Sequence, residues 1–241
     1  MQINIFQSSK ALHQAIANKI IQSVKTKPGS VLGLSTGSSP VETYTLLGRD
    51  HKENGTDYHR IVTFNLDEYV GLKGSHQQSY RYFMNIHLFN QLNIPLEQTH
   101  VPIGVGDLES NCEEYERQIQ AAGGIDLQLL GIGINGHIGF NEPGTSFESS
   151  THVAPLLKET IEANGRFFET TEEVPTKAVT MGIKTIMETR EIILLAYGSH
   201  KAAAVRDMVN GPVTEAVPAS ILQKHAHVTL YLDEEAAALL Q

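Results

Sequence analysis

The feature that most constrains this chain is the regular return of short apolar segments that have no polar face. These predicted strands end at small, polar or acidic residues, and they cover residues 3–6, 31–34, 61–66, 127–132, 192–197 and 227–232. The stretches between them have helical patterns, such as the apolar residues that recur every fourth position from Leu12 to Val24. Strands that are apolar on both faces and separated by helices form parallel sheets with both faces covered. The sequence therefore predicts an α/β fold with a Rossmann-like, open, mostly parallel sheet.

A single domain over residues 1–241 is expected, because no linker, repeat or low-complexity tract interrupts the pattern. The stretch from about 145 to 177 is polar and irregular, with Gly144, Pro155 and Gly165 as breakers. We interpret it as a loop-and-helix insert that could act as a lid. Helical patterns are also present at 201–209 and 234–238.

Composition narrows the range of partners. The formal net charge is −9 and no run of Lys or Arg is present, so we expect no nucleic-acid partner. No apolar run approaches the roughly 18 residues of a membrane span, so we expect no membrane partner. The first residues lack a secretory pattern and Cys112 is the only cysteine, so we expect a cytoplasmic location. An anionic small molecule would have to be held by a local pocket.

Four predicted strands are followed by unusual polar segments. These segments are residues 35–40, 67–68, 133–142 and 198–201. Ligands of open parallel sheets collect at the carboxyl ends of the strands. We therefore expect the four segments to meet at one rim.

The first segment is suited to phosphate. Small residues and hydroxyls precede a predicted helix that begins near Pro40, and such a helix start offers N–H groups and partial positive charge to an anion. The candidate phosphate contacts are Ser35, Thr36, Gly37, Ser38 and Ser39. A plain strand-to-helix turn with a serine cap is the alternative interpretation.

Asp67 and Glu68 follow a buried strand, where partial shielding from water raises the pKa of a carboxylate toward a range useful for proton transfer. Neighbouring residues point in different directions, so we expect one of the two to serve. Asp67 is our candidate because it is nearer the strand end. The alternative is a solvated acidic turn.

The densest signal lies between residues 131 and 144, where five glycines fall within fourteen residues. Such density indicates unusual backbone angles or close approach to a ligand. His137 lies among them and is suited to proton transfer as a histidine, with Asn135 or Glu142 available to orient it. A structural histidine is the alternative. No second His or Cys follows at metal-ligand spacing, so no metal is expected.

Two cations complete the candidate site. Lys201 begins a predicted helix, where its charge opposes the helix dipole and suggests a bound anion. Arg166 lies in the insert and could reach inward to a phosphate. Each of them, taken alone, could be an ordinary surface residue.

These segments together resemble the glucosamine/galactosamine-6-phosphate isomerase family, which includes the glucosamine-6-phosphate deaminases. The most specific matches are residues 62–69 and 136–143, and the segments 164–168 and 198–202 add to them. The resemblance implies that Asp67 moves the C2 proton to C1 and that His137 opens the sugar ring with help from Glu142. It also implies that residues 35–39, Arg166 and Lys201 hold the phosphate. Many family members have Asp at the position of Asn135.

The implied reaction converts α-D-glucosamine 6-phosphate and water into fructose 6-phosphate and ammonia, with no metal or organic cofactor. Some family members are activated by N-acetylglucosamine 6-phosphate through basic residues that align here with His152 and Ala154, so we expect weak or absent activation. A 6-phosphogluconolactonase-like hydrolase and a non-catalytic sugar-phosphate sensor are the rival interpretations. Self-association is left open.

Overall fold

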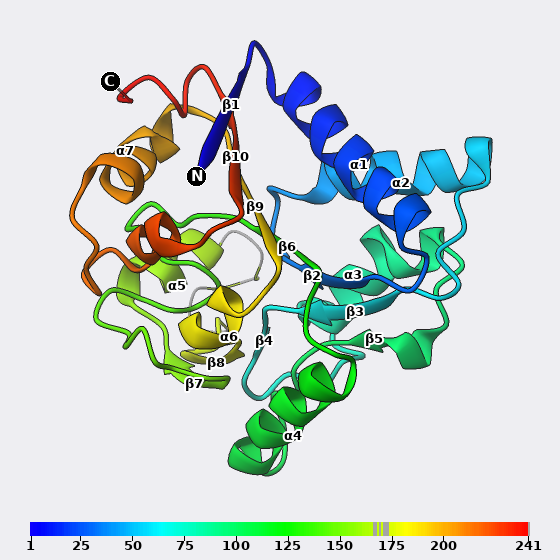
Figure 1. Ribbon diagram of the computed structural model, residues 1–241. Coiled ribbons are helices and arrows are strands. Elements are labelled where there is room, and N and C mark those ends of the chain that lie inside the picture. Colours follow the sequence, from blue (N-terminus) through cyan, green and yellow to red (C-terminus); the bar gives the residue numbers. More distant parts are fainter. Residues whose placement is uncertain (166–167, 169, 171–173, 241) are drawn as a thin grey trace.

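The computed structural model of the protein describes residues 1–165, 168, 170 and 174–240. Its centre is a seven-stranded sheet in which all six neighbouring pairs are parallel (Figure 1). In spatial order the strands are β1 (Gln2–Phe6), β10 (Val228–Asp233), β9 (Glu191–Ala196), β6 (Leu127–Leu130), β2 (Val31–Leu34), β3 (Val62–Asn65) and β5 (Thr99–His100). The predicted α/β fold with an open parallel sheet is confirmed.

Helices cover both faces of the sheet (Figure 1). One face carries α1 (Ser9–Thr26), α2 (Val41–Asn54) and α3 (Tyr80–His87), with the 3₁₀ helices η1 (Phe89–Gln91) and η2 (Leu96–Gln98) following α3. The other carries α4 (Leu108–Ala121), α6 (Ile183–Met187), α7 (Ala202–Asn210) and the 3₁₀ helix η6 (Pro218–Lys224).

The sheet separates two hydrophobic cores, because successive side chains of a strand point to opposite faces. In β9, Ile193 and Leu195 pack in the core under α1 and α2, while Ile192 and Leu194 pack in the core under α7. All four of these side chains are buried. This double burial is the reason that β9 is apolar at consecutive positions.

Helix α1 shows how local sequence sets one boundary. Ser8 is its N-cap, and its side chain accepts a hydrogen bond from the main-chain N–H of Ala11. The expected stripe is buried against the sheet at Leu12, Ile16 and Ile20, as a period of 3.6 residues requires.

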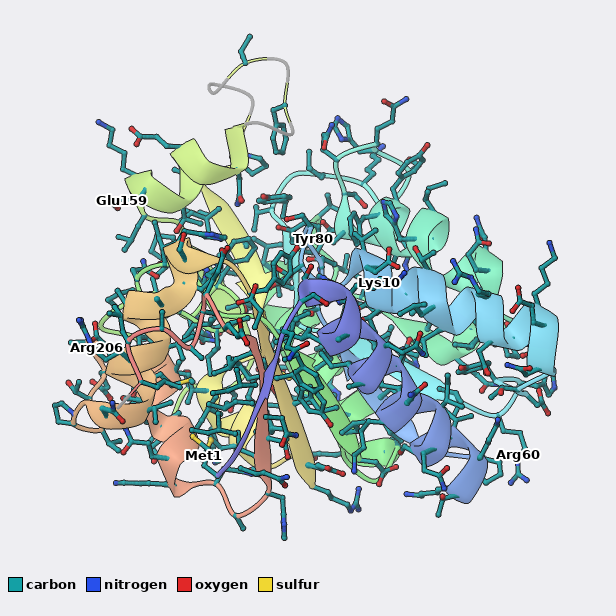
Figure 2. The ribbon with its side chains drawn as sticks, turned by 90° about the horizontal axis from the view of Figure 1, so that it is seen from above. Met1, Lys10, Arg60, Tyr80, Glu159 and Arg206 are labelled. Atoms are coloured by element: carbon teal, nitrogen blue, oxygen red, sulfur yellow. The ribbon has the colours of Figure 1, made fainter. Side chains whose placement is uncertain are left out.

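A second, smaller sheet lies beside the first. It has three strands in the order β4 (Asp67–Tyr69), β8 (Lys177–Thr180) and β7 (His152–Pro155), and both pairs are antiparallel. Helix α5 (Lys158–Asn164) follows β7 and packs through Ile161 against a third hydrophobic cluster that contains Tyr69 and Phe140. Figure 2 shows α5, which carries Glu159, projecting from the body of the molecule.

The stretch 145–177 thus contains a strand as well as the expected helix. The strand β7 was not predicted, because of its four residues only Ala154 is buried and its apolar pattern is too weak to indicate a strand. The predicted helix at 234–238 is wrong: β10 ends at Asp233, and the chain then continues in turns. One main-chain N–H, that of Ala237, bonds four residues back to Asp233, whereas those of Ala238 and Leu240 bond three residues back. Within the described part of the chain, no helix combines the length and apolarity needed to span a membrane.

Candidate active site

Four adjacent strands of the sheet, β9, β6, β2 and β3, carry the four polar segments at their carboxyl ends. Because these strands are parallel, the segments emerge at the same edge. The structure therefore brings together the segments that the sequence placed at one rim.

The segment after β2 leads directly into α2. Gly37 has a φ of 86°, a left-handed conformation that favours glycine, and Pro40 occupies the N-cap position of the helix. Ser35 is buried, and its main-chain carbonyl accepts a 2.6 Å hydrogen bond from the hydroxyl of Tyr44. Among these residues Ser38 is the exposed one. The loop is thus pinned at its first residue and open at its tip, next to the positive end of a helix.

Asp67 and Glu68 have separate surroundings, as expected for successive residues of the strand β4. Glu68 accepts hydrogen bonds from the main-chain N–H groups of Tyr69, Tyr80 and Arg81, at 2.9, 2.9 and 3.0 Å. It therefore satisfies N–H groups at the beginning of α3. Asp67 is left to face the rim.

The Asp67 carboxylate is buried and has a hydroxyl partner in the phosphate loop, since Oγ1 of Thr36 donates to Oδ1 over 3.4 Å. Burial raises the pKa of Asp67 to about 7, the charge of Glu68 adds to the rise, and the hydrogen bond from Thr36 partly opposes it. A carboxyl with this pKa can accept and return a proton near neutral pH.

The glycines of residues 131–144 make room for side chains of the site. A Cβ at Gly133 would lie 2.3 Å from Cε1 of His137, so the imidazole occupies the space above this glycine. Gly139 has a φ of 58°, and a Cβ there would lie 2.9 Å from Oγ1 of Thr180 and 3.7 Å from Oδ2 of Asp67. Asp67 therefore lies against the same loop that carries His137.

His137 is paired with a carboxylate. Its Nδ1 lies 3.2 Å from Oε2 of Glu142, although the contact departs from the angles of a good hydrogen bond. Asn135 does not contact the imidazole in this way: its Nδ2 donates to Oε2 of Glu142 over 2.9 Å, and its Oδ1 accepts from the main-chain N–H of His137. Of the two orienting groups that the sequence left open, Glu142 faces the ring and Asn135 holds Glu142.

Glu142 has a further partner that sequence reasoning missed. The hydroxyl of Thr160, on α5, donates to Oε1 over 2.5 Å. Burial acts to raise the pKa of Glu142, but the neighbouring His137 and the hydrogen-bond donors outweigh burial and lower it to about 2. Glu142 is therefore ionised beside the imidazole throughout the neutral range.

Of the two predicted cations, the structure describes Lys201 but not Arg166. Lys201 ends the 3₁₀ helix η5 (Ser199–Lys201), one residue before α7 begins, and its Nζ donates to the main-chain carbonyl of Ile132 over 2.6 Å. Ile132 lies just beyond β6, the neighbour of β2, so the ammonium group lies at the edge of the sheet from which the loop of residues 35–39 also emerges. Arg166 lies outside the described residues. No group of three or more metal-ligating side chains occurs in the described ranges.

The chain is similar to known proteins over nearly its whole length. The family described as glucosamine-6-phosphate isomerases/6-phosphogluconolactonase matches residues 6–231. A glucosamine-6-phosphate deaminase of Geobacillus sp. (strain WCH70) is 53% identical over 95% of this chain and 92% of its own length. One of Thermoanaerobacter pseudethanolicus (strain ATCC 33223 / 39E) is 48% identical over 100% of this chain and 95% of its own length.

Solved structures give the same result. A monomeric glucosamine-6-phosphate deaminase superposes with a TM-score of 0.97 and is 44% identical, with coverage of 99% of this chain and 100% of that one. The 6-phosphogluconolactonase of Trypanosoma brucei has a TM-score of 0.80 at 20% identity, with coverage of 100% and 98%, which shows a common fold. From the family match and the full-length relatives together, this chain belongs to the glucosamine-6-phosphate isomerase/6-phosphogluconolactonase family.

Proposed function

We propose that the protein is a glucosamine-6-phosphate deaminase, which converts α-D-glucosamine 6-phosphate and water into D-fructose 6-phosphate and ammonia. The observation that carries the proposal is the placement of Asp67, a buried carboxyl with a pKa near 7, against the loop that bears the His137–Glu142 pair. Isomerisation of an aldose needs a base for a carbon-bound proton as well as a group that opens the ring. The close full-length relatives with this activity support the same reaction.

The phosphate would bind between the loop of residues 35–39 and Lys201, with Arg166 as a third contact. The N–H groups at the start of α2 and the ammonium group of Lys201 favour an anion there. Binding energy from this remote group would hold C1 and C2 of the sugar against Asp67.

His137 would open the ring by taking the proton of the C1 hydroxyl and delivering a proton to the ring oxygen. The ionised Glu142 beside Nδ1 stabilises the imidazolium that forms in between, and Asn135 holds Glu142 in place. The product of this step is the open-chain aldehyde.

Asp67 would then take the proton from C2 and return it to C1. The substrate's protonated amine gives up one proton to the aldehyde oxygen, so C1 becomes a hydroxymethyl group and C2 becomes a protonated imine through the substrate's own nitrogen. Water adds to this imine and ammonia leaves, which yields the ketone. The protein's groups serve as proton carriers throughout, and each such contact contributes roughly 10²–10⁴-fold in rate.

We further propose a cytoplasmic location and a sugar phosphate as the small-molecule partner. The experiment that tests the activity is an ammonia-release assay on glucosamine 6-phosphate, with native protein and the Asp67→Asn variant. Native protein should release ammonia, and the variant should bind substrate with a kcat lower by about 10²–10⁴-fold. Hydrolysis of 6-phosphogluconolactone without ammonia release would instead assign the lactonase activity.

A further inference from the structure

Glu68 has a set of contacts that the proposed reaction does not use. Its side chain is buried, and its two carboxylate oxygens accept from three main-chain N–H groups, two of which belong to the first turn of α3. Donors on both oxygens match an ionised carboxylate. The contacts join the strand β4 to α3 over a gap of twelve residues.

The side chains on the two faces of β4 contact different parts of the protein. Asp67 faces Thr36 and Gly139, while Glu68 lines a cavity of about 260 Å³ together with Arg81, Thr99 and His100. Any movement of β4 relative to α3 would therefore displace Asp67 from the rim, since the two carboxylates are on adjacent residues of one short strand.

We propose that Glu68 is a positioning residue for Asp67: its carboxylate fastens β4 to the start of α3 and supplies a fixed negative charge beside the Asp67 carboxylate. The expected effect of Glu68 on catalysis rests on the proposed function. The contacts of Glu68 with Tyr69, Tyr80 and Arg81 do not depend on that function.

The proposed effect of the Glu68 charge on Asp67 follows from the groups that surround the Asp67 carboxylate. Burial is the main cause of its raised pKa, and Glu68 is the next. Among the described residues, the titratable groups that interact with Asp67 include four phenols whose pKa burial raises, so that they are uncharged at neutral pH: Tyr44 on α2, Tyr69 on β4, Tyr80 on α3 and Tyr115 on α4. Lys201 reaches the same rim at Ile132. Glu68 is the carboxylate next to Asp67 on the same strand: burial raises the pKa of Glu68, its three main-chain N–H donors oppose that rise, and the guanidinium group of Arg81 interacts with its charge.

Two substitutions separate the effect of the Glu68 charge from the effect of its hydrogen bonds, which attach β4 to α3. Glu68→Gln keeps the length of the side chain but removes the charge, and it sets an amide N–H₂ group against one of the main-chain donors. Glu68→Asp keeps the charge but shortens the reach to the N–H groups of Tyr80 and Arg81. The matched control is Glu116→Gln, because Glu116 also accepts three hydrogen bonds, from Thr151 and Thr185, and joins other elements.

The expected results differ between the variants. In Glu68→Gln the acidic limb of the kcat/KM–pH profile should move to lower pH, and kcat should fall by about 10²-fold at the optimum. In Glu68→Asp kcat should fall by roughly tenfold with the limb near its native position. Glu116→Gln should change thermal stability and leave the limb in place. If Glu68→Gln does not fold, Glu68→Asp and the control carry the test.

A second readout separates this proposal from the proposed function. The carboxyl carbon of Asp67 can be titrated by NMR in each folded variant, whether or not ammonia is released. A lower titration midpoint in Glu68→Gln than in native protein and in Glu116→Gln supports the role of Glu68. An unchanged midpoint, or a Glu68→Asp variant with native kcat, would overturn it.

Discussion

The hydroxyl of Thr160 donates a hydrogen bond of 2.5 Å to Oε1 of Glu142, which joins helix α5 to the carboxylate that faces His137. Thr160 is buried, although α5 projects from the body of the molecule (Figure 2). The position of α5 and the environment of Glu142 are therefore linked by one contact.

Replacing Thr160 by Val should lower kcat with little effect on the binding of the phosphate. Valine keeps the shape of threonine but removes the donor, so Glu142 loses one of the hydrogen bonds that hold its carboxylate against His137. A hydrogen bond to a charged group contributes about 1.5–3 kcal/mol, which corresponds to a loss of roughly 10- to 100-fold in kcat. Steady-state kinetics check this, with Thr160→Ser as the control that retains the hydroxyl. Native kcat in Thr160→Val would show that the contact is structural only.

The pH dependence should report the ionisation of Asp67. Because burial raises its pKa to about 7, the base is half protonated near neutrality, so kcat/KM should be half-maximal at about pH 7 and level off above it. Measuring kcat/KM for ammonia release from about pH 5 to about pH 9 checks this prediction. A limb near the ordinary pKa of an aspartate would contradict the buried environment of Asp67.

The same carboxyl should destabilise the fold when it is ionised. Its pKa is raised from 3.8 to about 7, so the folded protein binds more protons than the unfolded chain between these values. The free energy of unfolding therefore falls as pH rises through this window. The Asp67→Asn variant should be more stable than native protein above pH 7, by on the order of 1–4 kcal/mol, and the difference should shrink toward pH 4. Urea unfolding at several pH values measures it.

Two glycines allow a matched test of the space around Asp67. Gly139 and Gly144 both have positive φ, at 58° and 93°, but a Cβ would meet Thr180 and Asp67 at Gly139 and nothing within 4 Å at Gly144. Alanine at either position should cost about 1–2 kcal/mol in stability. Gly139→Ala should in addition lower kcat by about tenfold, because the new Cβ would lie 2.9 Å from Oγ1 of Thr180, the residue of β8 that pairs with Asp67. Equal kcat values in the two variants would count against this coupling between Gly139 and the strand that carries Asp67.

The rim could be predicted from the sequence because it follows from one rule. Once residues 31–34, 61–66, 127–132 and 192–197 are strands of a parallel sheet, their following segments must share an edge. The placement of Asp67 and His137 at that edge needed no knowledge of side-chain contacts. Alternation of side chains along the chain indicated that one of the two carboxylates serves, and Asp67 was chosen because it is nearer the strand end.

The side-chain contacts of Glu142 with Thr160 and Asn135 could not be predicted from local sequence patterns. Thr160 lies 18 residues from Glu142, in a stretch whose strand β7 is mostly half-exposed, so neither the strand nor the contact has a periodic signature. The role of Asn135 was open for a similar reason, since its distance from Glu142 depends on the turn that Gly136 makes at a φ of 83°. Side-chain pairs across turns are set by tertiary packing, which one sequence does not display.

N-acetylglucosamine 6-phosphate should activate the protein weakly or not at all. The two positions that align with basic effector contacts are in β7, where the side chain of Ala154 is buried in the third cluster and Nδ1 of His152 contacts the main-chain carbonyl of Ser150 over 2.8 Å. A buried methyl group cannot bind a phosphate, and the remaining imidazole would be a single weak contact. Apparent KM for glucosamine 6-phosphate, measured with increasing N-acetylglucosamine 6-phosphate, should stay constant or rise through competition. A strong fall in apparent KM would mean that an effector site exists elsewhere on the molecule.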